Sequence, residues 1–596
     1  MFSTYKKRLK DYISNHPVIS SVVINSAFLL ITMNFCEVKY ETSDDFIMSA
    51  IISGVYGGVH DPHLMFINVL WGYLLLPFYY LVPSINWYLV SLLFVSLMSF
   101  TAMTYIVLKQ NGVKTGLFFA FFIFVFLGTD SYIMFQFTKT AATAVMAGSL
   151  LFINALRNVN KFNKKELICG GILAVVGTMI RFNASYVAGG FILLILVYGA
   201  IRFKREGISF SKKHILKVVT SGAVLIAIVF SLKAADSFIY SSNDDYKFYK
   251  EYNHVRGLIL DRPSYDYSVL KDRYEEAGLS ENDYFLLRTW NFGDSDFYTL
   301  DRMEDVVDIL NENQSKLRLS PYYIKDALCD RGYTSYPIIW ASILLLIVTL
   351  IFINICWLFP VASVGLGTAY ILLFAALGKM VYRVEYSVIL CSIFAILYMW
   401  RKEDFIFVDN DKHVRKVFSV FAICLLVFVS PVFLMAKQGK KLQNEEYTHF
   451  IQDKFYESWY YDYNRLRTAT VNDNAYKALK DEIISNQDNY YFISFNTAVQ
   501  VLYFGDNPFI NNFDKYPSNA SFFSGVTVNF PLLIDNLSKN GIDNPMKSLA
   551  DNNVYLIDNI YQEYIFEFIK EHYYPDAKMS LYKNLDGFNI WKISAE

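Results

Sequence analysis

The chain has 596 residues, of which 54% are hydrophobic and 18% charged, and its formal net charge at pH 7 is -1. This composition is more apolar and less charged than that of a soluble globular protein, so it indicates a polytopic membrane protein. A net charge near zero also argues against nucleic acid as a partner. The six cysteines have neither disulfide nor metal spacing, and we interpret them as small core residues.

Eleven apolar segments have the roughly 17 to 25 residues that a membrane-spanning helix needs. They lie near 17–36, 87–108, 115–130, 137–156, 166–182, 185–202, 215–235, 337–358, 361–378, 384–400 and 415–436. No small-residue cleavage site clearly follows the first segment, so we interpret it as a retained helix and not a signal peptide.

A further apolar run at 64–82 decides the topology, because every later loop changes side if this run crosses the membrane. Lysine and arginine accumulate in short cytoplasmic loops. If 64–82 stays on the outer face, nearly every basic cluster between spans is cytoplasmic. The run also contains Pro77 and aromatic residues such as Trp71 and Tyr80, which prefer the headgroup level. We therefore predict eleven spans, with the amino terminus inside and the carboxyl terminus outside.

Two extracytoplasmic regions follow from this topology, a long outer loop at 236–336 and a tail at 437–596. The loop is too long for a plain connection and is expected to fold over the membrane face. In the tail, alternating helix and strand patterns predict a small α/β domain. The expected elements are a helix over Asp473–Asn486, strands over Tyr490–Phe495 and Val554–Ile557, a helix over 560–572, and a hairpin of Met579–Lys583 with Asn589–Ile593 that turns at Asp586-Gly587.

Two adjacent carboxylates, Asp44 and Asp45, follow the first span. One interpretation is structural: Ser43 caps a short helix, and the carboxylates favour its positive N-terminal end. The other is that one carboxylate is a general base at the membrane surface, and that its neighbour orients it or helps to bind a metal. Because adjacent helical residues point about 100° apart, only one of the pair is expected to face a cavity.

Several cations lie at the outer ends of predicted spans: Lys139, Arg181, and Lys379 with Arg383 in one short loop. Each could snorkel toward headgroups, and Glu385 could pair with Arg383 or Lys379. Outer cations run against the positive-inside tendency, however, and ionisable groups at membrane depth usually mark a ligand path. Because lysine and arginine bind phosphate, Lys139, Arg181 and Arg383 are candidate ligands of a lipid phosphate.

Two further pairs of residues are candidates for contacts to a ligand. His60 and His63 bracket Asp61-Pro62, a spacing that suits a metal ion but lacks a third nearby ligand, so packing around the turn is the alternative. In the long outer loop, Arg256 and Trp290 lie in stretches that mix aromatic, acidic and amide side chains. Such stretches suit a sugar-binding surface, because rings stack on sugars and polar edges form hydrogen bonds. Packing alone explains them equally well.

Together these residues resemble the GT-C superfamily of polytopic membrane glycosyltransferases. The resemblance rests on Ser43-Asp44-Asp45-Phe46, on Asp61-Pro62-His63-Leu64 and on Phe137-Thr138-Lys139-Thr140-Ala141, which are similar to motifs of bacterial members that modify cell-surface polysaccharides. We therefore expect an α-helical, GT-C-like membrane domain at 1–436, with outer-face juxtamembrane helices in the first loop at 37–86. The small extracytoplasmic α/β domain then occupies 437–596.

The resemblance implies an enzyme of the bacterial cytoplasmic membrane that transfers a sugar from a polyprenyl-phosphate carrier, with inversion, to a polysaccharide or glycolipid acceptor on the outer face. The first-loop acid of the family is the catalytic base, and it corresponds here to Asp44 or Asp45. Several relatives carry Asp-Glu where this chain has Asp-Asp, which leaves open which carboxylate is the base and whether a divalent cation assists. No other cofactor is expected. We assign His60, His63, Arg256 and Trp290 as candidate contacts to sugar or acceptor.

Two other functional classes remain as alternatives. A transporter or flippase for a lipid-linked saccharide could use the same acids and cations along a translocation path. Transporters commonly show paired halves with interrupted helices, and no such duplication is visible in the sequence. A non-catalytic surface-polysaccharide assembly protein that keeps the fold is the third candidate.

Overall fold

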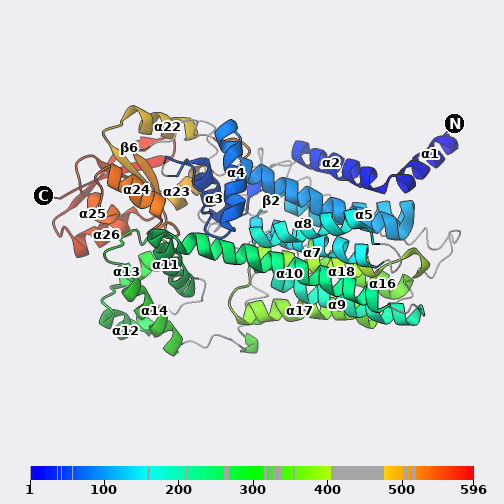
Figure 1. Ribbon diagram of the computed structural model, residues 1–596. Coiled ribbons are helices and arrows are strands. Elements are labelled where there is room, and N and C mark those ends of the chain that lie inside the picture. The colour runs from blue at the N-terminus through cyan, green and yellow to red at the C-terminus, as the bar shows by residue number, and fades with distance from the viewer. Residues whose placement is uncertain are drawn as a thin grey trace.

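The computed structural model shows a long bundle of helices that carries an α/β domain and a smaller helical region at one end (Figure 1). The residues that the structure describes are 2–35, 38–41, 43–56, 58–157, 162–207, 211–260, 267–313, 319–322, 324–325, 337–353, 356–404, 475–502, 508–511 and 518–595. All statements below concern these residues.

The bundle is built from helices that coincide with ten of the eleven predicted spans. These are α2 (Pro17–Phe35), α5 (Trp87–Ile123), α7 (Phe137–Leu156), α8 (Lys164–Ile180), α9 (Ala184–Arg205), α10 (Lys212–Ser241), α16 (Pro337–Phe352), α17 (Leu358–Ala376) and α18 (Tyr382–Met399). Helix α5 covers two predicted spans, because Gly112 adopts a positive φ of 73° and kinks the chain between them. The predicted span 415–436 lies outside the described residues.

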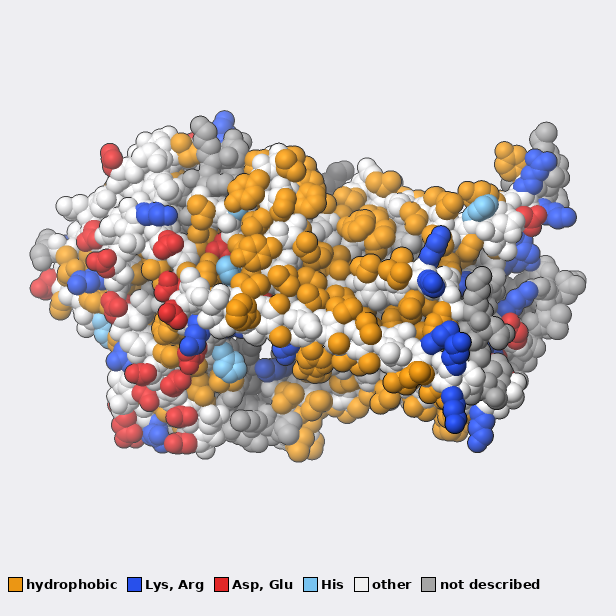
Figure 2. Space-filling view, viewed as in Figure 1, with side chains coloured by type: hydrophobic (Ala, Val, Ile, Leu, Met, Phe, Trp, Pro, Cys, Tyr) orange, Lys and Arg blue, Asp and Glu red, His pale blue; other side chains and the backbone are white. Residues whose placement is uncertain are grey.

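Within the described part of the chain, seven helices are both long and apolar enough to cross a membrane. Helices α8 and α16 are shorter than the others, so the count of eleven spans stays a prediction. Figure 2 shows a broad apolar belt around the bundle, with acidic side chains gathered beyond one end and Lys and Arg gathered at the other. Such a belt is what a lipid bilayer requires, and the chain is a multi-pass membrane protein.

Glycine lets two of the bundle helices approach closely. On α7 and α8, a Cβ atom placed at Gly148 would lie 2.4 Å from the backbone nitrogen of Ala174, and one at Gly170 would lie 2.5 Å from that of Phe152. Either contact is too short for real atoms, so only glycine fits. Small residues at helix contacts are the usual way in which membrane helices pack without a hydrophobic driving force.

The first outer loop contributes two helices and one short strand. Helix α3 (Ser43–Ser53) carries the paired aspartates, and α4 (Val69–Leu81) corresponds to the apolar run 64–82. Helix α4 lies across the bundle instead of along it (Figure 1), as expected of a run that stays at the membrane surface. Strand β1 (Lys39–Tyr40) pairs in parallel with β2 (Met134–Phe135), which ties the start of this loop to the residues just before α7.

The long outer loop folds into helices α11 (Asp244–Leu260), α12 (Lys271–Glu276), α13 (Glu281–Arg288) and α14 (Leu300–Asn313). It interlocks with the C-terminal domain through two close approaches. A Cβ atom at Gly293 would lie 2.2 Å from the Phe523 ring, and one at Gly525 would lie 2.3 Å from the Phe292 ring. The Gly525 amide also donates to the Trp290 carbonyl at 2.8 Å. The loop and the tail therefore pack as one extramembrane unit.

The C-terminal domain is a five-stranded sheet of order β4-β3-β5-β7-β6, with the first three strands parallel and the last two forming an antiparallel hairpin. The strands are β3 (Tyr490–Ser494), β4 (Ala520–Phe523), β5 (Val554–Ile557), β6 (Lys578–Leu585) and β7 (Phe588–Ser594). Helices α22 (Ala475–Ser485), α23 (Phe495–Leu502), α24 (Pro531–Lys539), α25 (Pro545–Ser548) and α26 (Gln562–His572) complete it.

Most expected elements of this domain are confirmed, namely β3, β5, α22, α26 and the β6–β7 hairpin. The turn of this hairpin has a positive φ at both Asp586 and Gly587. Asp-Gly sequences favour that backbone conformation, which is why they predict a two-residue hairpin turn. Strand β4 and helices α23, α24 and α25 were not expected. The predicted α-helical membrane fold with a small α/β C-terminal domain is therefore confirmed, whereas the boundary at 436 lies outside the described residues.

Candidate active site at the outer end of the bundle

Asp45 is fully buried on the face of α3 that points into the protein. Its Oδ1 atom accepts a hydrogen bond from the Tyr88 hydroxyl at 2.8 Å and another from the Phe137 backbone N–H at 3.1 Å. Phe137 is the first residue of α7, so the carboxylate sits at the positive end of that helix. Burial raises the pKa of Asp45 well above its ordinary value, the Tyr88 hydroxyl opposes this, and the neighbouring Asp44 adds to it. Asp45 joins α3 to α5 and α7.

Asp44 precedes Asp45 in the first turn of the same helix and is only half-buried. The two side chains point in different directions, as the angle between adjacent helical residues predicts. A reacting group in solution or in the membrane surface can reach Asp44, whereas Asp45 is enclosed. Of the two carboxylates, Asp44 is therefore the one that is partly exposed, and which of them acts as a base stays a prediction.

Lys139 is fully buried and pairs with two carboxylates, Glu41 and Asp130, each at 2.7 Å. The Tyr382 hydroxyl donates to the second oxygen of Asp130, and the Lys139 ammonium lies 5.6 Å from the centre of the Tyr382 ring. Burial raises the pKa of Glu41, and the Lys139 charge opposes this. Since the ammonium is already shared between two carboxylates, it holds the start of α7 to the first loop and to the residues before β2.

Arg383 lies half-buried in the first turn of α18, next to this buried triad. Its positive charge lowers the pKa of Glu41, which shows that the two groups are close. Arg383 forms no ion pair within 4.0 Å among the residues that the structure describes. Together with Lys139 it balances the charges of the two carboxylates.

Arg181 follows the last residue of α8 and lies against two aromatic rings, one from the first loop and one from α7. Its guanidinium carbon is 5.0 Å from the centre of the Phe137 ring and 5.9 Å from that of Phe66. The two rings are stacked on each other at 6.2 Å. Because the Phe137 N–H contacts Asp45, one residue separates the acidic helix from this cation.

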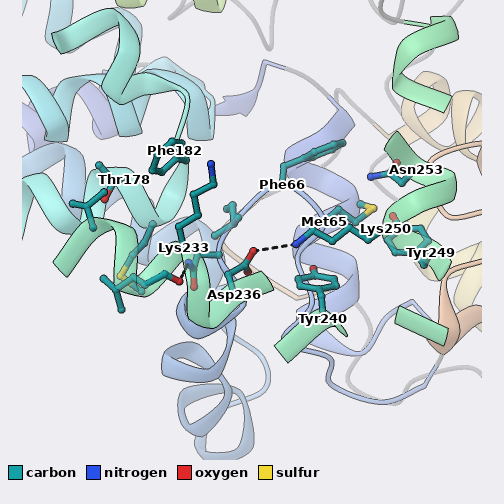
Figure 3. Close-up of a pocket in the computed structure, with 15 residues that line it drawn as sticks. Met65, Phe66, Thr178, Phe182, Lys233, Asp236, Tyr240, Tyr249, Lys250 and Asn253 are labelled. Carbon is teal, nitrogen blue, oxygen red and sulfur yellow. Dashed lines mark hydrogen bonds and ion pairs between the residues drawn. The ribbon is translucent and has the colours of Figure 1, made fainter. Parts of the chain in front are cut away.

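A cavity of about 140 Å³ opens beside these rings, at the ends of α8 and α10 that lie nearest the α/β domain (Figure 3). Its lining includes Phe66, Thr178 and Phe182. It also includes six residues of α10 and α11, namely Lys233, Asp236, Tyr240, Tyr249, Lys250 and Asn253. Figure 3 shows Lys233 reaching toward Phe182, whose ring centre is 3.9 Å from the ammonium. Lys250 lies 3.4 Å from Asp236, which also accepts the Val69 N–H at 2.8 Å. Two lysines and one aspartate give this cavity a net positive lining.

The two histidines of the first loop have different surroundings. A ring nitrogen of His60 lies 2.8 Å from the Ile52 carbonyl, and the ring packs near Tyr80. His63 places Nδ1 2.7 Å from Asp61, and its ring stacks on Tyr246 with centres 3.7 Å apart. His60 therefore contacts the end of α3, whereas His63 belongs to a cluster with Asp61 and α11.

The structure brings the two predicted loop residues, Arg256 and Trp290, into direct contact. The Arg256 guanidinium lies 4.7 Å from the centre of the Trp290 ring, and its Nε donates to Asn253 at 2.8 Å. Asn253 lines the cavity. Arg256 itself is buried. It contacts the lining of the cavity through the Asn253 side-chain amide, which it orients by that hydrogen bond.

The C-terminal domain contacts the acidic helix directly. Phe46, next to Asp45, packs against Phe495 and Phe522 with ring centres 5.5 and 5.9 Å apart. Just beyond α3, the Tyr56 hydroxyl donates to the Phe522 carbonyl at 3.0 Å and also contacts Thr527. The tail therefore holds α3 in place from the side opposite the bundle.

Four charged residues of this site were missed by the sequence interpretation: Glu41, Asp130, Lys233 and Lys250. Asp130 ends an apolar segment, and ionisable groups at membrane depth are a functional signal in their own right. Lys233 similarly interrupts the outer end of the span 215–235. These two were visible, whereas nothing in the sequence joins Glu41 to Lys139.

Candidate metal ligands are grouped elsewhere. Among the described residues, the one set of three His, Cys, Asp or Glu side chains whose ligand atoms lie within 4.8 Å of one another is Asp283, Glu571 and His572. It lies between α13 and α26, where His572 Nε2 is 2.8 Å from Asp283. A divalent cation at Asp44 and Asp45 stays a prediction.

No family model matches the chain. A search of curated proteins also finds no match. The chain is similar to the crystal structure of ArnT from Cupriavidus metallidurans in the apo state, with 10% sequence identity and a TM-score of 0.41. It is also similar to the crystal structure of the same protein bound to undecaprenyl phosphate, with 8% identity and a TM-score of 0.42. Each match covers 97% of this chain and 98% of the other.

Proposed function

We propose that the protein is a membrane glycosyltransferase that takes a sugar from a polyprenyl-phosphate donor and transfers it to a cell-surface polysaccharide or glycolipid on the outer face of the membrane. The observation that carries this proposal is the cation-lined cavity at the ends of α8 and α10, which is linked through the stacked rings of Phe66 and Phe137 to helix α3, the helix that bears Asp44. An accessible carboxylate, cations and a nearby apolar helix surface are the parts that this reaction needs.

Asp44 is the proposed base. Its carboxylate takes the proton of an acceptor hydroxyl as the hydroxyl oxygen attacks the anomeric carbon of the donor sugar. The bond between that carbon and the phosphate oxygen breaks, and its electron pair leaves with the polyprenyl phosphate. Attack from the face opposite the leaving group inverts the anomeric configuration. Asp45 orients α3 through Tyr88 and Phe137 and does not itself touch the acceptor.

The leaving phosphate needs cations more than it needs an acid, because it is already a good leaving group near neutral pH. Lys233 and Lys250 line the cavity, Arg181 lies against the Phe66 ring that also lines it, and Arg383 lies near Glu41 of the buried triad. Preorganised cations stabilise charge that develops on a leaving group. We assign the donor phosphate to the cavity, with Lys139 acting as a positioning residue through Glu41 and Asp130.

The apolar tail of the donor fits the outer surface of α10. Val224, Ile226 and Phe230 on this helix are 55 to 59% exposed. Lys233 follows these residues on α10 and lines the cavity, so a chain lying along α10 ends at the cations. The proposed contacts for sugar or acceptor remain His60, His63, Arg256 and Trp290.

The test is transfer of radiolabelled sugar from a panel of polyprenyl-phosphate donors by the purified full-length protein. Replacing Asp44 with Asn is expected to lower the transfer rate about 10²- to 10⁴-fold, the usual contribution of a general base. Asp45→Asn keeps both accepted hydrogen bonds and is expected to act mainly on stability. Equal loss in the two variants would contradict the assignment of Asp44, and full activity in both would remove the base from the mechanism.

The flippase alternative predicts a different outcome when the purified protein is reconstituted into vesicles with the same donors. Movement of intact lipid-linked sugar across the membrane, without transfer to any acceptor, would replace the glycosyltransferase proposal. The acidic residues argue against that alternative, because Asp44 and Asp45 lie on a short helix beyond the end of the bundle and not within a spanning helix.

A further inference from the structure

A second cavity lies at the opposite, basic end of the bundle. It measures about 230 Å³ and is formed by four helices, where α7 and α18 end, α9 approaches its last turn and α10 begins. Its walls are apolar side chains such as Ile153, Ile195 and Val218. Leu196, Ile215 and Val219 are 46 to 61% exposed, so the groove opens on the apolar belt that faces lipid.

Polar groups gather at one part of this groove. Arg157, Arg401, His214, Tyr198 and Tyr398 line it together with the apolar residues. Tyr398 is only 6% exposed, and its buried hydroxyl has no hydrogen-bond partner among the described residues. An enclosed hydroxyl without a partner costs free energy unless something binds to it. This end of the groove is therefore built for a polar group.

The charges around the groove are not balanced. Arg202 and Arg401 share Glu206, at 2.6 and 3.2 Å, and Arg202 also pairs with Asp404 at 2.5 Å. Arg157 pairs with no carboxylate in the described part of the chain; with the Gln110 amide oriented to satisfy its neighbours, Arg157 donates to that amide oxygen at 3.2 Å. Among the described residues, three guanidinium groups thus face two carboxylates. Burial and the charges of Arg157 and Arg202 lower the pKa of Arg401 to about 10.

We propose that this groove binds an anionic glycerophospholipid, with its phosphate between Arg157 and Arg401 and one acyl chain against α9 and α10. The apolar walls suit an acyl chain, and the opening faces the bilayer. An anion at the arginine pair removes their mutual repulsion and can accept a hydrogen bond from Tyr398. Basic pockets between membrane helices are a known means of recognising lipid headgroups. The site lies at the other end of the bundle from the proposed active site and does not depend on it.

Gly199 offers a way to fill the groove without disturbing the fold. It lines the cavity, and a Cβ atom placed there meets nothing within 4 Å. Gly189 on the same helix also has open space around its Cβ position but does not line the cavity. Gly199→Leu and Gly189→Leu are therefore a matched pair that adds the same side chain to α9 inside and outside the groove.

The experiment measures binding of phosphatidylglycerol and phosphatidylcholine to the purified full-length protein in detergent, by native mass spectrometry and by the shift in thermal unfolding midpoint. We expect saturable binding of phosphatidylglycerol, weakened about 30-fold in Arg157→Gln/Arg401→Gln, because each interfacial cation contributes about fivefold. Lys204→Gln/Arg205→Gln removes two exposed charges from the same end and is expected to have a much smaller effect. Gly199→Leu should weaken binding at least as much as the arginine double variant, and Gly189→Leu should not.

Four outcomes would overturn the proposal. Absence of saturable binding to the wild type means that the groove has another occupant. Equal losses in the two charge-removing double variants mean that the interaction is with the basic end in general. Unchanged binding in Gly199→Leu excludes the groove, even where the arginine variants prove unstable. If inorganic phosphate displaces bound phosphatidylglycerol as effectively as unlabelled phosphatidylglycerol does, the arginines form an anion site and not a lipid site.

Discussion

Two groups of charged side chains lie at the end of the bundle that carries the α/β domain, and they differ in how far they are already paired. Glu41 and Asp130 are buried and both pair with the Lys139 ammonium at contacts of 2.7 Å, and Arg383 beside them supplies the second positive charge. Lys233 and Lys250 are exposed and line a cavity that holds only one carboxylate, Asp236. The first group stabilises the arrangement of helices, while the second has positive charge left over for a ligand. Proximity to the membrane surface does not by itself separate the two roles.

The largest effect on stability is expected from the buried triad. Replacing Lys139 with Met leaves Glu41 and Asp130 buried without their cation, and breaking a buried pair typically costs about 3–5 kcal/mol. Unfolding in detergent, followed by tryptophan fluorescence, measures the loss. Lys379→Met is the matched control, because Lys379 is exposed and surface substitutions usually change stability by less than about 0.5 kcal/mol. A stable Lys139→Met protein that has lost only donor binding would instead make Lys139 a phosphate ligand, as its sequence context predicts.

Substitution of the cavity lysines should separate binding from folding. Lys233→Gln and Lys250→Gln are each expected to weaken donor binding by about tenfold, since a hydrogen bond to a charged group contributes about 1.5 kcal/mol or more. Binding of a polyprenyl phosphate, measured by fluorescence quenching, gives the affinity, and thermal unfolding reports the fold.

Lys247→Gln is the control for these lysines, because Lys247 is exposed on α11 but does not line the cavity. Affinity that falls equally in all three variants would mean that the donor responds to surface charge alone. Unchanged affinity in the two cavity variants would move the phosphate site elsewhere, with Arg383 and Arg181 as the next residues to replace.

Much of the fold follows from local patterns in the sequence. Apolar length predicts the bundle helices, and the positive-inside tendency with Pro77 predicts that α4 does not run along them. The Asp586-Gly587 turn predicts the last hairpin. Strand β4 was missed because Ala520 to Phe523 is short, and its first residues have little strand preference. Its one neighbour in the sheet, the parallel strand β3, supplies a buried context that only the assembled sheet provides.

The sequence indicates single residues of the candidate site but not which of them contact one another. Helix geometry predicts that the two aspartates point in different directions, and the structure buries Asp45 while leaving Asp44 partly exposed; which of them faces a cavity stays a prediction. The sequence could not indicate that Lys139 meets Glu41, since that contact depends on the parallel pairing of β1 with β2. The cavity lysines come from the end of a span and from the helix that follows it, and only folding of the long loop brings them opposite Phe66.

The smallest effect, and the most specific to the buried group on α3, is the pH dependence of stability due to Asp45. Its folded pKa is raised, so the folded protein binds the proton more readily than the unfolded chain, whose pKa is near 3.8. Stability relative to Asp45→Asn is therefore constant below that value and falls as pH rises toward the folded pKa, by at most about 1.4 kcal/mol per pH unit. Unfolding midpoints of both proteins across this range measure the difference.

Tyr88→Phe sharpens the test of Asp45. The Tyr88 hydroxyl lowers the pKa of Asp45 by donating a hydrogen bond to the carboxylate. Its removal should raise the folded pKa further and extend the falling limb to higher pH, whereas Tyr88→Phe in the Asp45→Asn background should leave the profile flat. A parallel profile for wild type and Asp45→Asn would mean that the carboxylate is solvated in the folded protein. Asp45 would then be as accessible as Asp44, and the distinction between a positioning acid and a base would be lost.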